Sequence, residues 1–314
     1  MNLKKPKFWD YERPSLYSYL LIPFSILLRI LNSVKKKTQV KNTKIKTICV
    51  GNIYIGGTGK TSLSIKINEI LNKHKVKSCF IKKFYLDQND EQKLLKSKGA
   101  LFLNSKRIDA INEAIEKDYQ VAILDDGLQD YSINYDITFV CFNNINWIGN
   151  GLTIPAGPLR EKINSLKNYK HIFLNGNLEN LENIKKCIFG INSKINLHLG
   201  RYVPLNLNEF DNQEKYLVFS GIGNHETFVS MLKNYKLNIV KDIEFPDHYK
   251  YTNNDIKNIL KQAKEINAKI ITTEKDLYRL GNNKIDEIKI LKSELQIIDE
   301  DKLINTILKN NEAN

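Results

Sequence analysis

The sequence predicts an α/β protein whose core is a parallel sheet, and three observations lead to that class. Short apolar runs rich in β-branched residues recur at residues 47–50, 78–84, 100–104, 121–124, 137–142 and 172–174. Helical segments separate several of these runs, and strands that alternate with helices favour a parallel sheet. Gly51 and Asp125 fall at the ends of two runs, where a parallel sheet binds its ligands.

The length of the chain and a change in its pattern indicate two units after an N-terminal helix. With 314 residues, the chain is long enough for two domains that each bury a core. We expect the helix in residues 1–34, the core domain in 35–205 and a smaller α/β domain in 206–314. The boundary falls in a loop-rich connector expected at 197–214, and the runs 216–219, 239–245 and 269–273 follow as strands.

The composition limits the classes of binding partner but does not identify one of them. The formal net charge is +13 at pH 7, but the basic residues are spread along the chain, so we do not expect a nucleic-acid partner. An anionic phospholipid or a phosphorylated substrate suits the same charge. The four cysteines lie far apart, with no CxxC pair and no histidine at metal-ligand spacing, which indicates reduced thiols in a cytoplasmic protein.

The N-terminal segment 16–31 is strongly apolar, with Arg29 inside it and three lysines at 35–37 directly after it. As a helix it spans about 24 Å at 1.5 Å per residue, which is short of the roughly 30 Å hydrocarbon core of a bilayer. Pro23 also weakens it as a straight span, and no small-residue cleavage site follows it. A packed helix without lipid contact is one interpretation. We favour a helix that dips into the cytoplasmic leaflet, with its lysines at anionic head groups.

A glycine-rich turn joins the first apolar run to a segment with apolar residues at helical spacing. The turn contains Gly56, Gly57, Thr58, Gly59, Lys60 and Thr61. Glycines let backbone N–H groups converge on an anion, a lysine here reaches the β- and γ-phosphates of a nucleotide, and the threonine is a magnesium ligand. Tyr54 stands where the GxxxxGK[ST] pattern requires glycine, so the strand-helix context carries the prediction. The alternative is a glycine turn beside a surface lysine.

Carboxylates and an arginine near the expected strand ends are candidates for binding a metal ion and phosphate. Asp125 and Asp126 end a buried run, where a carboxylate holds Mg²⁺ beside a phosphate loop; alternatively, one of them caps the next turn. Arg160 and Glu161 follow a rigid segment with two prolines. The arginine could neutralise phosphate charge, and the glutamate could orient it or join the metal shell, whereas an exposed ion pair is the alternative.

Two further residues are weak candidates when each is taken alone. His248 follows Asp247 in the second unit, and histidine titrates near neutral pH, which suits proton transfer. Most lone histidines in loops are nevertheless not catalytic. Asp90 lies in a polar loop, where by itself it is a solvated acid or a helix N-cap.

Taken together and in order, these stretches resemble the signatures of the tetraacyldisaccharide 4′-kinase family, the lipid A 4′-kinases. The resemblance covers most of the chain. It rests on Phe8-Trp9 with the apolar segment around Pro23, on residues 50–61, 155–161 and 245–248, and on the runs Asp125-Asp126-Gly127-Leu128-Gln129, Gly221-Ile222-Gly223-Asn224 and Thr273-Glu274-Lys275-Asp276. Any one stretch could arise by chance, whereas the ordered set is specific.

The resemblance implies a P-loop NTPase-type parallel sheet core joined to a smaller α/β domain, with an N-terminal membrane-associated helix. It implies phosphorylation, with ATP and Mg²⁺, of the 4′-hydroxyl of a tetraacylated glucosamine disaccharide 1-phosphate. It also implies that the reaction takes place at the cytoplasmic face of the bacterial inner membrane, with the enzyme peripheral or monotopic there. We expect a monomer.

Residue roles are carried over by position. Lys60 and Thr61 serve the nucleotide phosphates and Mg²⁺, and Asp125 and Asp126 serve the metal region. Asp90 becomes the candidate base, with His248 as its partner. The same site is lined by Gln129, Arg160 and Glu161.

The chain departs from the usual family pattern mainly on the acceptor side. Where the family shows Ser-Arg-Gly-Tyr-Gly after the second strand, this chain has Lys82-Lys83-Phe84-Tyr85-Leu86. In addition, Asn89 replaces glycine before Asp90, Asp130 replaces histidine and His225 replaces proline. The contacts of the missing arginine and glycines either move to Lys82 or Lys83, or are lost with a reduction in activity.

The rival function from another class is a P-loop switch ATPase of the partitioning or membrane-targeting type, whose loops also run Gly-Gly-x-Gly-Lys-Thr. Such a protein dimerises on ATP binding and hydrolyses ATP without an acceptor. It does not account for residues 155–161 or for a second unit with His248. A kinase of another acceptor is a third alternative, because the phosphate site carries no information about the acceptor.

Overall fold

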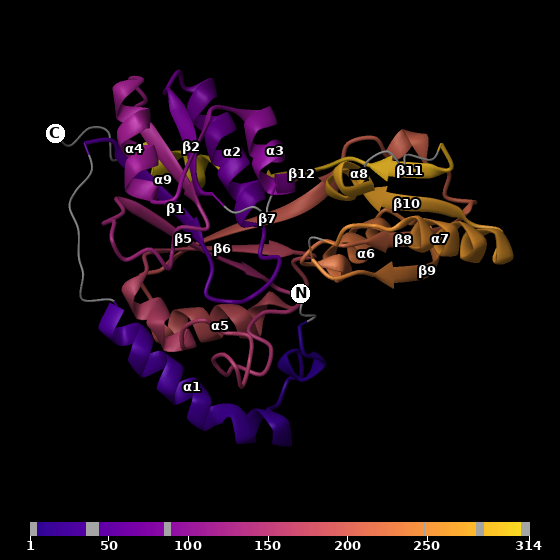
Figure 1. Cartoon of the computed structure of the whole chain (residues 1–314), viewed down its shortest axis with the longest axis horizontal. Coiled ribbons are helices and arrows are strands. Elements are labelled where there is room, and N and C mark those ends of the chain that lie inside the picture. The colour runs from indigo at the N-terminus through magenta and orange to yellow at the C-terminus, as the bar shows by residue number, and fades with distance from the viewer. Residues whose placement is uncertain (1–4, 36–43, 85–88, 248, 281–285, 309–314) are drawn as a thin grey trace.

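The computed structural model describes residues 5–35, 44–84, 89–247, 249–280 and 286–308, which form two sheets (Figure 1). The larger sheet has eight strands in the order β12-β7-β6-β5-β1-β4-β2-β3, and the smaller has four in the order β11-β10-β8-β9. Neighbouring strands are parallel except β12, which runs antiparallel to β7. The predicted α/β class, with a mostly parallel core and a smaller second sheet, is confirmed.

Helices cover both faces of the larger sheet because its strands are apolar on both sides. The strands are β1 (Lys46–Gly51), β2 (Ser78–Lys83), β3 (Leu101–Asn104), β4 (Val121–Asp125), β5 (Ile137–Asn143), β6 (His171–Gly176), β7 (Asn196–Pro204) and β12 (Ser293–Ile297). Ile48 and Val50 pack with α2 (Lys60–Lys73) and α9 (Glu300–Leu308), whereas Cys49 packs with α5 (Leu181–Ile191). On the second face, α4 (Arg107–Glu116) covers β2 and β4. Such alternation is typical of parallel strands buried on both faces.

Helices also cover both faces of the smaller sheet. Its strands are β8 (Lys215–Ser220), β9 (Asn238–Glu244), β10 (Lys269–Thr273) and β11 (Ile288–Leu291). One core forms with α6 (His225–Asn234) and the other with α7 (Asn253–Glu265) and α8 (Glu274–Leu280). Helix α3 (Asn89–Lys98) contacts both α2 and α8, so it belongs to the border between the two units. The 3₁₀ helices are η1 (Lys7–Trp9), η3 (Ile163–Asn168) and η4 (Leu207–Glu209).

The boundary between the units differs from the sequence-based expectation in two places. Residues 197–204 were expected in a connector but form most of β7, so that prediction is wrong for this part. Its pattern is weak because β7 mixes buried residues with half-buried and exposed ones. Residues 293–308 were expected in the second domain but form β12 and α9, which return to the larger sheet. They do so because their apolar side chains complete its core: Leu295, Ile297, Leu303 and Ile307.

Helix α1 (Leu16–Lys35) lies outside the two sheets (Figure 1). It docks through small polar side chains. Ser25 Oγ donates to the carbonyl oxygen of Thr153 at 2.8 Å and accepts from the backbone N–H of Ala156 at 3.1 Å. Asn150 Nδ2 donates to Ser18 Oγ at 3.0 Å. In the part of the chain that the structure describes, no helix is both long enough and apolar enough to span a membrane.

Candidate active site

The predicted phosphate loop connects the carboxyl end of β1 to α2, which begins at Lys60. Gly59 has a φ of 76°, in the left-handed region that favours glycine. A Cβ atom at this position would lie 2.5 Å from Nδ2 of Asn175. The same amide donates to the carbonyl oxygen of Thr58 at 2.7 Å, and Asn52 Nδ2 donates to Thr58 Oγ1 at 3.0 Å. The loop is therefore held in shape by buried amides at the carboxyl ends of β1 and β6, which lie on either side of β5.

The smaller unit touches this loop backbone to backbone. The N–H of Gly57 donates to the carbonyl oxygen of Gly223 at 3.1 Å, and Asn224 Nδ2 donates to the carbonyl oxygen of Gly57 at 3.4 Å. A Cβ atom at Gly57 would lie 2.5 Å from the carbonyl carbon of Gly223. Gly56 precedes this contact with a φ of 138°. The double glycine thus allows the turn after β8 to approach the phosphate loop directly.

Asp126 lies where two basic side chains converge. Its Oδ1 is 3.7 Å from Lys60 Nζ and 3.5 Å from Arg160 Nη1. Its φ of 55° directs the residue out of the line of β4, and such an angle is uncommon outside glycine. Burial acts to raise the pKa of Asp126, but Lys60 and Arg160 outweigh it and lower that pKa to about 2. The carboxylate is therefore ionised between two cations.

Gln129 links Arg160 to the residues that precede the phosphate loop. Arg160 Nη1 donates to Gln129 Oε1 at 2.6 Å, and Gln129 Nε2 donates to the carbonyl oxygen of Asn52 at 2.8 Å. The backbone N–H of Arg160 donates to the carbonyl oxygen of Ile53 at 2.6 Å. The loop 155–161 is consequently fixed alongside the phosphate loop, and its arginine points toward Asp126.

Glu161 has different partners from its neighbour Arg160. Its Oε1 accepts from the hydroxyl of Tyr131 at 3.0 Å, and its Oε2 accepts from that of Tyr169 at 3.5 Å. Burial and the nearby carboxylate both raise the pKa of these two phenols, so they remain hydrogen-bond donors at neutral pH. The structure brings Arg160 to the phosphate loop and places Glu161 against tyrosines.

Asp125 is fully buried and joins the first turns of α2 to the end of β2. Thr61 Oγ1 donates to its Oδ2 at 3.4 Å, and Ser64 Oγ donates to its Oδ1 at 3.2 Å. Lys82 Nζ donates to the same Oδ2 at 2.7 Å and to Glu91 Oε2 at 2.6 Å. Burial acts to lower the pKa of Lys82, but the two carboxylates raise it above its usual value, so the ammonium stays charged.

The oxygen atoms at this edge fit magnesium as it usually binds beside a nucleotide. Thr61, Asp125 and Asp126 offer a hydroxyl and two carboxylates, which are hard ligands. Among the described residues, no cluster of three or more His, Cys, Asp or Glu side chains could hold a metal ion. Magnesium needs only one or two carboxylates when substrate phosphates supply further oxygens. The donor set therefore suits a cation that arrives with a phosphate ligand.

The predicted base and its partner fall outside the described side chains. Asp90 belongs to the first turn of α3, but its side chain is not described, and His248 lies wholly outside the described residues. Asp247 is described, and its Oδ1 is 3.9 Å from Arg279 Nη2. A Cβ atom on Gly223 would lie 2.8 Å from Asp247 Oδ2, so the turn that touches the phosphate loop also borders this segment. The pairing of Asp90 with His248 stays a prediction.

Arg107 is a site residue that sequence reasoning missed. It is buried, its Nη2 donates to the carbonyl oxygen of Asp126 at 2.7 Å, and its Nη1 donates to Asp130 Oδ2 at 3.2 Å. It fixes the backbone of the residue on which Lys60 and Arg160 converge. No motif surrounds this arginine at the start of α4, and the only sequence signal was the departure at Asp130. Lys82 was likewise visible only as a departure.

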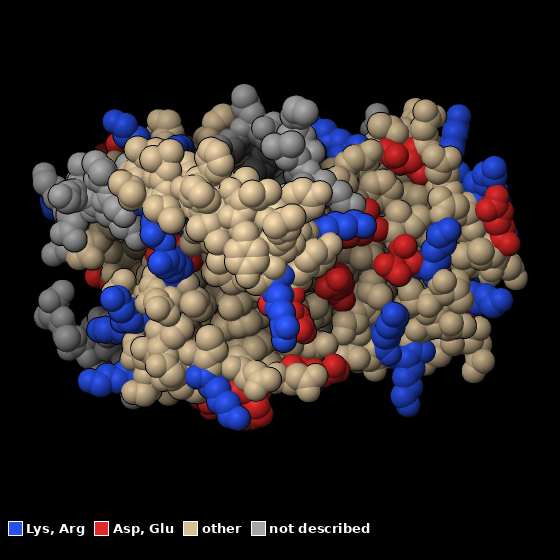
Figure 2. Space-filling model, turned by 90° about the horizontal axis from the view of Figure 1, so that it is seen from below, with Lys and Arg blue, Asp and Glu red and all other residues tan. Residues whose placement is uncertain are grey.

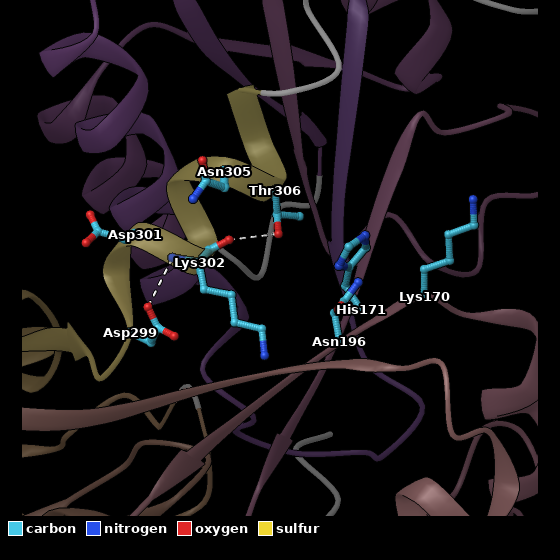
Figure 3. Close-up of a pocket in the computed structure, with 8 residues that line it drawn as sticks. All are labelled: Lys170, His171, Asn196, Asp299, Asp301, Lys302, Asn305 and Thr306. Carbon is cyan, nitrogen blue, oxygen red and sulfur yellow. Dashed lines mark hydrogen bonds between the residues drawn. The ribbon is translucent and has the colours of Figure 1, made fainter.

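A hollow of about 590 Å³ lies at the opposite edge of the larger sheet (Figure 3). His171 begins β6 and Asn196 begins β7, so the hollow adjoins the amino ends of strands, whereas the phosphate loop follows the carboxyl end of β1. Lys302 and Asn305 of α9 face it from the other side. The predicted site residues do not line this hollow, and its mixed lysines and aspartates offer no convergent set of donors.

The comparisons with known proteins agree on one family. The sequence pattern of the family described as tetraacyldisaccharide-1-P 4′-kinase matches residues 17–312. A tetraacyldisaccharide 4′-kinase of Pelagibacter ubique (strain HTCC1062) is 61% identical over 314 residues, which is 100% of both chains. The corresponding protein of Rickettsia canadensis (strain McKiel) is 34% identical over 304 residues, or 90% of this chain and 91% of that one.

A solved structure shares the fold. The crystal structure of LpxK from Aquifex aeolicus, determined in complex with ATP, aligns with a TM-score of 0.66 and 22% sequence identity. The alignment covers 94% of this chain and 99% of that chain. The alignment therefore includes both sheets.

Proposed function

Because the chain belongs to the tetraacyldisaccharide 4′-kinase family, we propose that its phosphoryl transfer takes place where Lys60, Asp126 and Arg160 meet. The enzyme is a kinase of lipid A biosynthesis that phosphorylates the 4′-hydroxyl of the tetraacyl disaccharide 1-phosphate precursor. Membership in this family does not favour the switch ATPase.

The observation that carries this assignment is the pair of cations on either side of one carboxylate. Lys60 and Arg160 both lie within 4 Å of Asp126, although they come from segments a hundred residues apart. Phosphoryl transfer depends mainly on alignment and on neutralising the charge of the transferred group. Two cations held at the end of the phosphate loop can align a phosphate and neutralise its charge, because the phosphate can replace the carboxylate as their partner.

ATP is the proposed phosphoryl donor. Backbone N–H groups at the start of α2 and the loop glycines would bind its phosphates, and Gln129 would keep Arg160 turned toward them. LpxK of Aquifex aeolicus, which shares this fold, has been crystallised in complex with ATP. Thr61 with Asp125 and Asp126 would hold Mg²⁺, whose charge neutralises the phosphate oxygens when it is bound. Glu161 would orient the loop of Arg160 through its two tyrosines.

On the acceptor side we assign Asp90 as the base for the 4′-hydroxyl and His248 as its partner. Asp90 lies in the first turn of α3, directly after the segment that leaves the carboxyl end of β2. Because β2 lies beside β4, this turn borders the edge that holds Asp125. His248 follows Asp247, which lies next to the turn that touches Gly57. Both assignments therefore suit a site between the two units.

The exposed side of α1 supports a membrane-bound position for the enzyme. Leu16, Leu20 and Phe24 are 74%, 64% and 59% exposed, whereas Ser18 and Ser25 of the same helix are buried against the loop 150–157. Figure 2 shows this face as a broad area with few charged side chains, with both basic and acidic side chains around it. An amphipathic helix of this kind lies in the interface of a bilayer. We assign the enzyme to the cytoplasmic face of the inner membrane, where its lipid substrate resides.

Removal of residues 1–33 tests the membrane assignment. The truncated enzyme should fail to sediment with vesicles that contain anionic phospholipid, while the full chain should sediment with them. The matched variant replaces Tyr278, an exposed aromatic residue of the smaller unit, by serine and should bind vesicles normally. Unchanged binding by the truncated chain would contradict the role of α1.

Labelled ATP and the purified lipid disaccharide test the site. The wild-type enzyme should place the label on the lipid, and Asp126→Asn, Asp90→Ala and His248→Ala should each reduce the transfer while the folded state is retained. Asp109→Asn, at an exposed position of α4, is the matched control and should keep full activity. Free phosphate together with ATP-dependent dimers, without label on the lipid, would instead support a switch ATPase.

A further inference from the structure

Lys82 is a buried lysine whose ammonium lies between two carboxylates from different elements. It is 2% exposed, Asp125 is fully buried, and the side chain of Glu91 is 18% exposed. The nitrogen lies 2.7 Å from Asp125 Oδ2 and 2.6 Å from Glu91 Oε2. A buried lysine needs charged partners, because an ammonium that is removed from water without them is unstable. Both ion pairs are therefore integral to this part of the fold.

The two partners belong to the two halves of the proposed site. Ile81 of β2 lies opposite Leu124 of β4, so the next residues, Lys82 and Asp125, emerge side by side at the carboxyl ends of their strands. Glu91 lies in the first turn of α3. Lys82 thus connects the edge that carries the phosphate loop to the beginning of the helix that carries the proposed base.

The start of α3 has its apolar anchor one turn further along. Leu95 is fully buried in the core of the larger sheet, whereas residues 89–91 precede it at the end of the helix nearest the site. Helix α3 also contacts α8 of the smaller unit, so the helix borders both units. A charged link from the sheet to Glu91 is well placed to set the position of that turn.

We propose that Lys82 is a positioning residue for phosphoryl transfer, which ties the first turn of α3, and with it Asp90, to Asp125 at the phosphate-binding edge. The inference rests on the proposed function, because it gives Lys82 a role only if the acceptor hydroxyl is activated from this turn. A small displacement of a reacting group is costly: a misplacement of about 1 Å can reduce the rate roughly 10²-fold. The pair with Glu91 limits such a displacement.

Glu91→Ala is the decisive variant, because it releases α3 while the pair between Lys82 and Asp125 remains. Alanine is a good helix former, so α3 should persist. We expect kcat for phosphorylation of the lipid disaccharide to fall about 10-fold or more, within the range that a misplaced group causes. The KM for ATP should stay within about 2-fold, since the phosphate loop keeps its contacts. A role in stability alone would lower the melting temperature without this separation of kcat from KM.

Lys82→Met and the double variant complete the cycle. Lys82→Met should show at least the kcat defect of Glu91→Ala, and adding Glu91→Ala to it should cause no further loss, because both act through one link. Glu113→Ala is the matched control, since Glu113 of α4 also pairs with a lysine, Lys117, which directly follows that helix, at 3.2 Å. It should leave kcat and KM unchanged.

A parallel measurement of Asp90→Asn separates this inference from the proposed function. If Asp90→Asn is inactive while Glu91→Ala has full kcat, the link through Lys82 is overturned and the base assignment stands. If Asp90→Asn is fully active while Glu91→Ala shows the kcat defect, the base assignment fails, and Lys82 positions another group of the same turn. Equal losses of kcat and of ATP affinity in Glu91→Ala would also overturn the proposal, because they would place Glu91 in nucleotide binding.

Discussion

The two edges of the larger sheet differ in their ionisable side chains: those at the carboxyl ends are charged and paired, whereas those at the amino ends include a buried histidine without partners in the described part of the chain. At the carboxyl ends of the strands, Lys60 and Arg160 converge on the ionised Asp126, and these side chains are each about one quarter exposed or less. At the amino ends, His198 is 2% exposed, and neither of its ring nitrogens has a partner among the described atoms. Its ring lies 5.7 Å from that of His171, and both contact Phe139.

The difference shows which edge is built to exchange partners. Basic side chains that are paired with a partly exposed carboxylate can exchange it for a phosphate with little loss of electrostatic stabilisation, since one anion replaces another. An imidazole that is buried without hydrogen bonds to described residues, as in His198, disfavours the charged form, so it stabilises the protein only as a neutral ring. The hollow beside His171 lies at the amino ends of the strands, whereas the chemistry points to the opposite edge.

The strongest test of this contrast removes one cation from the carboxyl edge. Lys60→Met should lower kcat for lipid phosphorylation by about 10²- to 10³-fold, because one preorganised charge near the transferred group is lost. Lys66→Met is the matched control on the same helix, where Lys66 lies 3.8 Å from Glu300 of α9 and away from the phosphate loop. Steady-state kinetics with the lipid disaccharide measure both variants. Equal activity of the two variants would contradict a role of the carboxyl edge in phosphoryl transfer.

Much of the phosphate edge could be predicted from local sequence. The glycine-rich turn between an apolar run and a helical segment identified Lys60, and the aspartates after a buried run identified Asp126. These residues follow strands whose order along the chain already implies one edge of a parallel sheet. Tyr54, which stands where the pattern has glycine, is compatible with the loop. Gly56 supplies the positive φ, and Gly57 allows the close backbone contact.

The remaining parts depend on contacts between segments far apart in the chain, and no local pattern reports them. Lys82 meets Asp125 only because β2 lies beside β4, and Arg107 reaches Asp126 from the start of α4. The return of β12 to the larger sheet was missed for the same reason: its alternation fits either sheet. The connector was misjudged because β7 is only partly buried, so its pattern is that of neither a core strand nor a loop.

A second test disturbs the same edge from the smaller unit. In Gly223→Ala the added Cβ would lie 2.5 Å from the nitrogen of Gly57 and 2.8 Å from Asp247 Oδ2, so the turn must move away from the phosphate loop. We expect kcat to fall about 10- to 100-fold with the fold retained. Gly190→Ala in α5, where a Cβ meets nothing within 4 Å, should keep full activity and gain about 0.5–1 kcal/mol of stability. Wild-type kinetics in Gly223→Ala would show that the contact between the units is dispensable.

The smallest effect on activity is expected at the amino edge, where the test is stability against pH. Burial, with neighbouring Lys302, lowers the pKa of both His171 and His198 to about 4. Above the ordinary histidine pKa of about 6.5, both rings are neutral in the folded and unfolded chains, and stability is complete. As the pH falls from about 6.5 to 4, these histidines are protonated in the unfolded chain but remain neutral in the folded chain, so the free energy of unfolding declines. His198 alone accounts for about 3 kcal/mol at most.

His198→Phe isolates this contribution. Phenylalanine keeps a ring beside Phe139 and removes two unpartnered nitrogens, so the free energy of unfolding at neutral pH should be equal to or higher than that of the wild type. Between pH 6.5 and 4, its unfolding free energy in urea titrations should fall less steeply, while kcat at pH 7 stays unchanged. His74→Gln, at an exposed helix end, should keep the wild-type slope. If His198→Phe lost activity instead, the amino edge would influence the reaction, and the division of the sheet into a reactive and a structural edge would not hold.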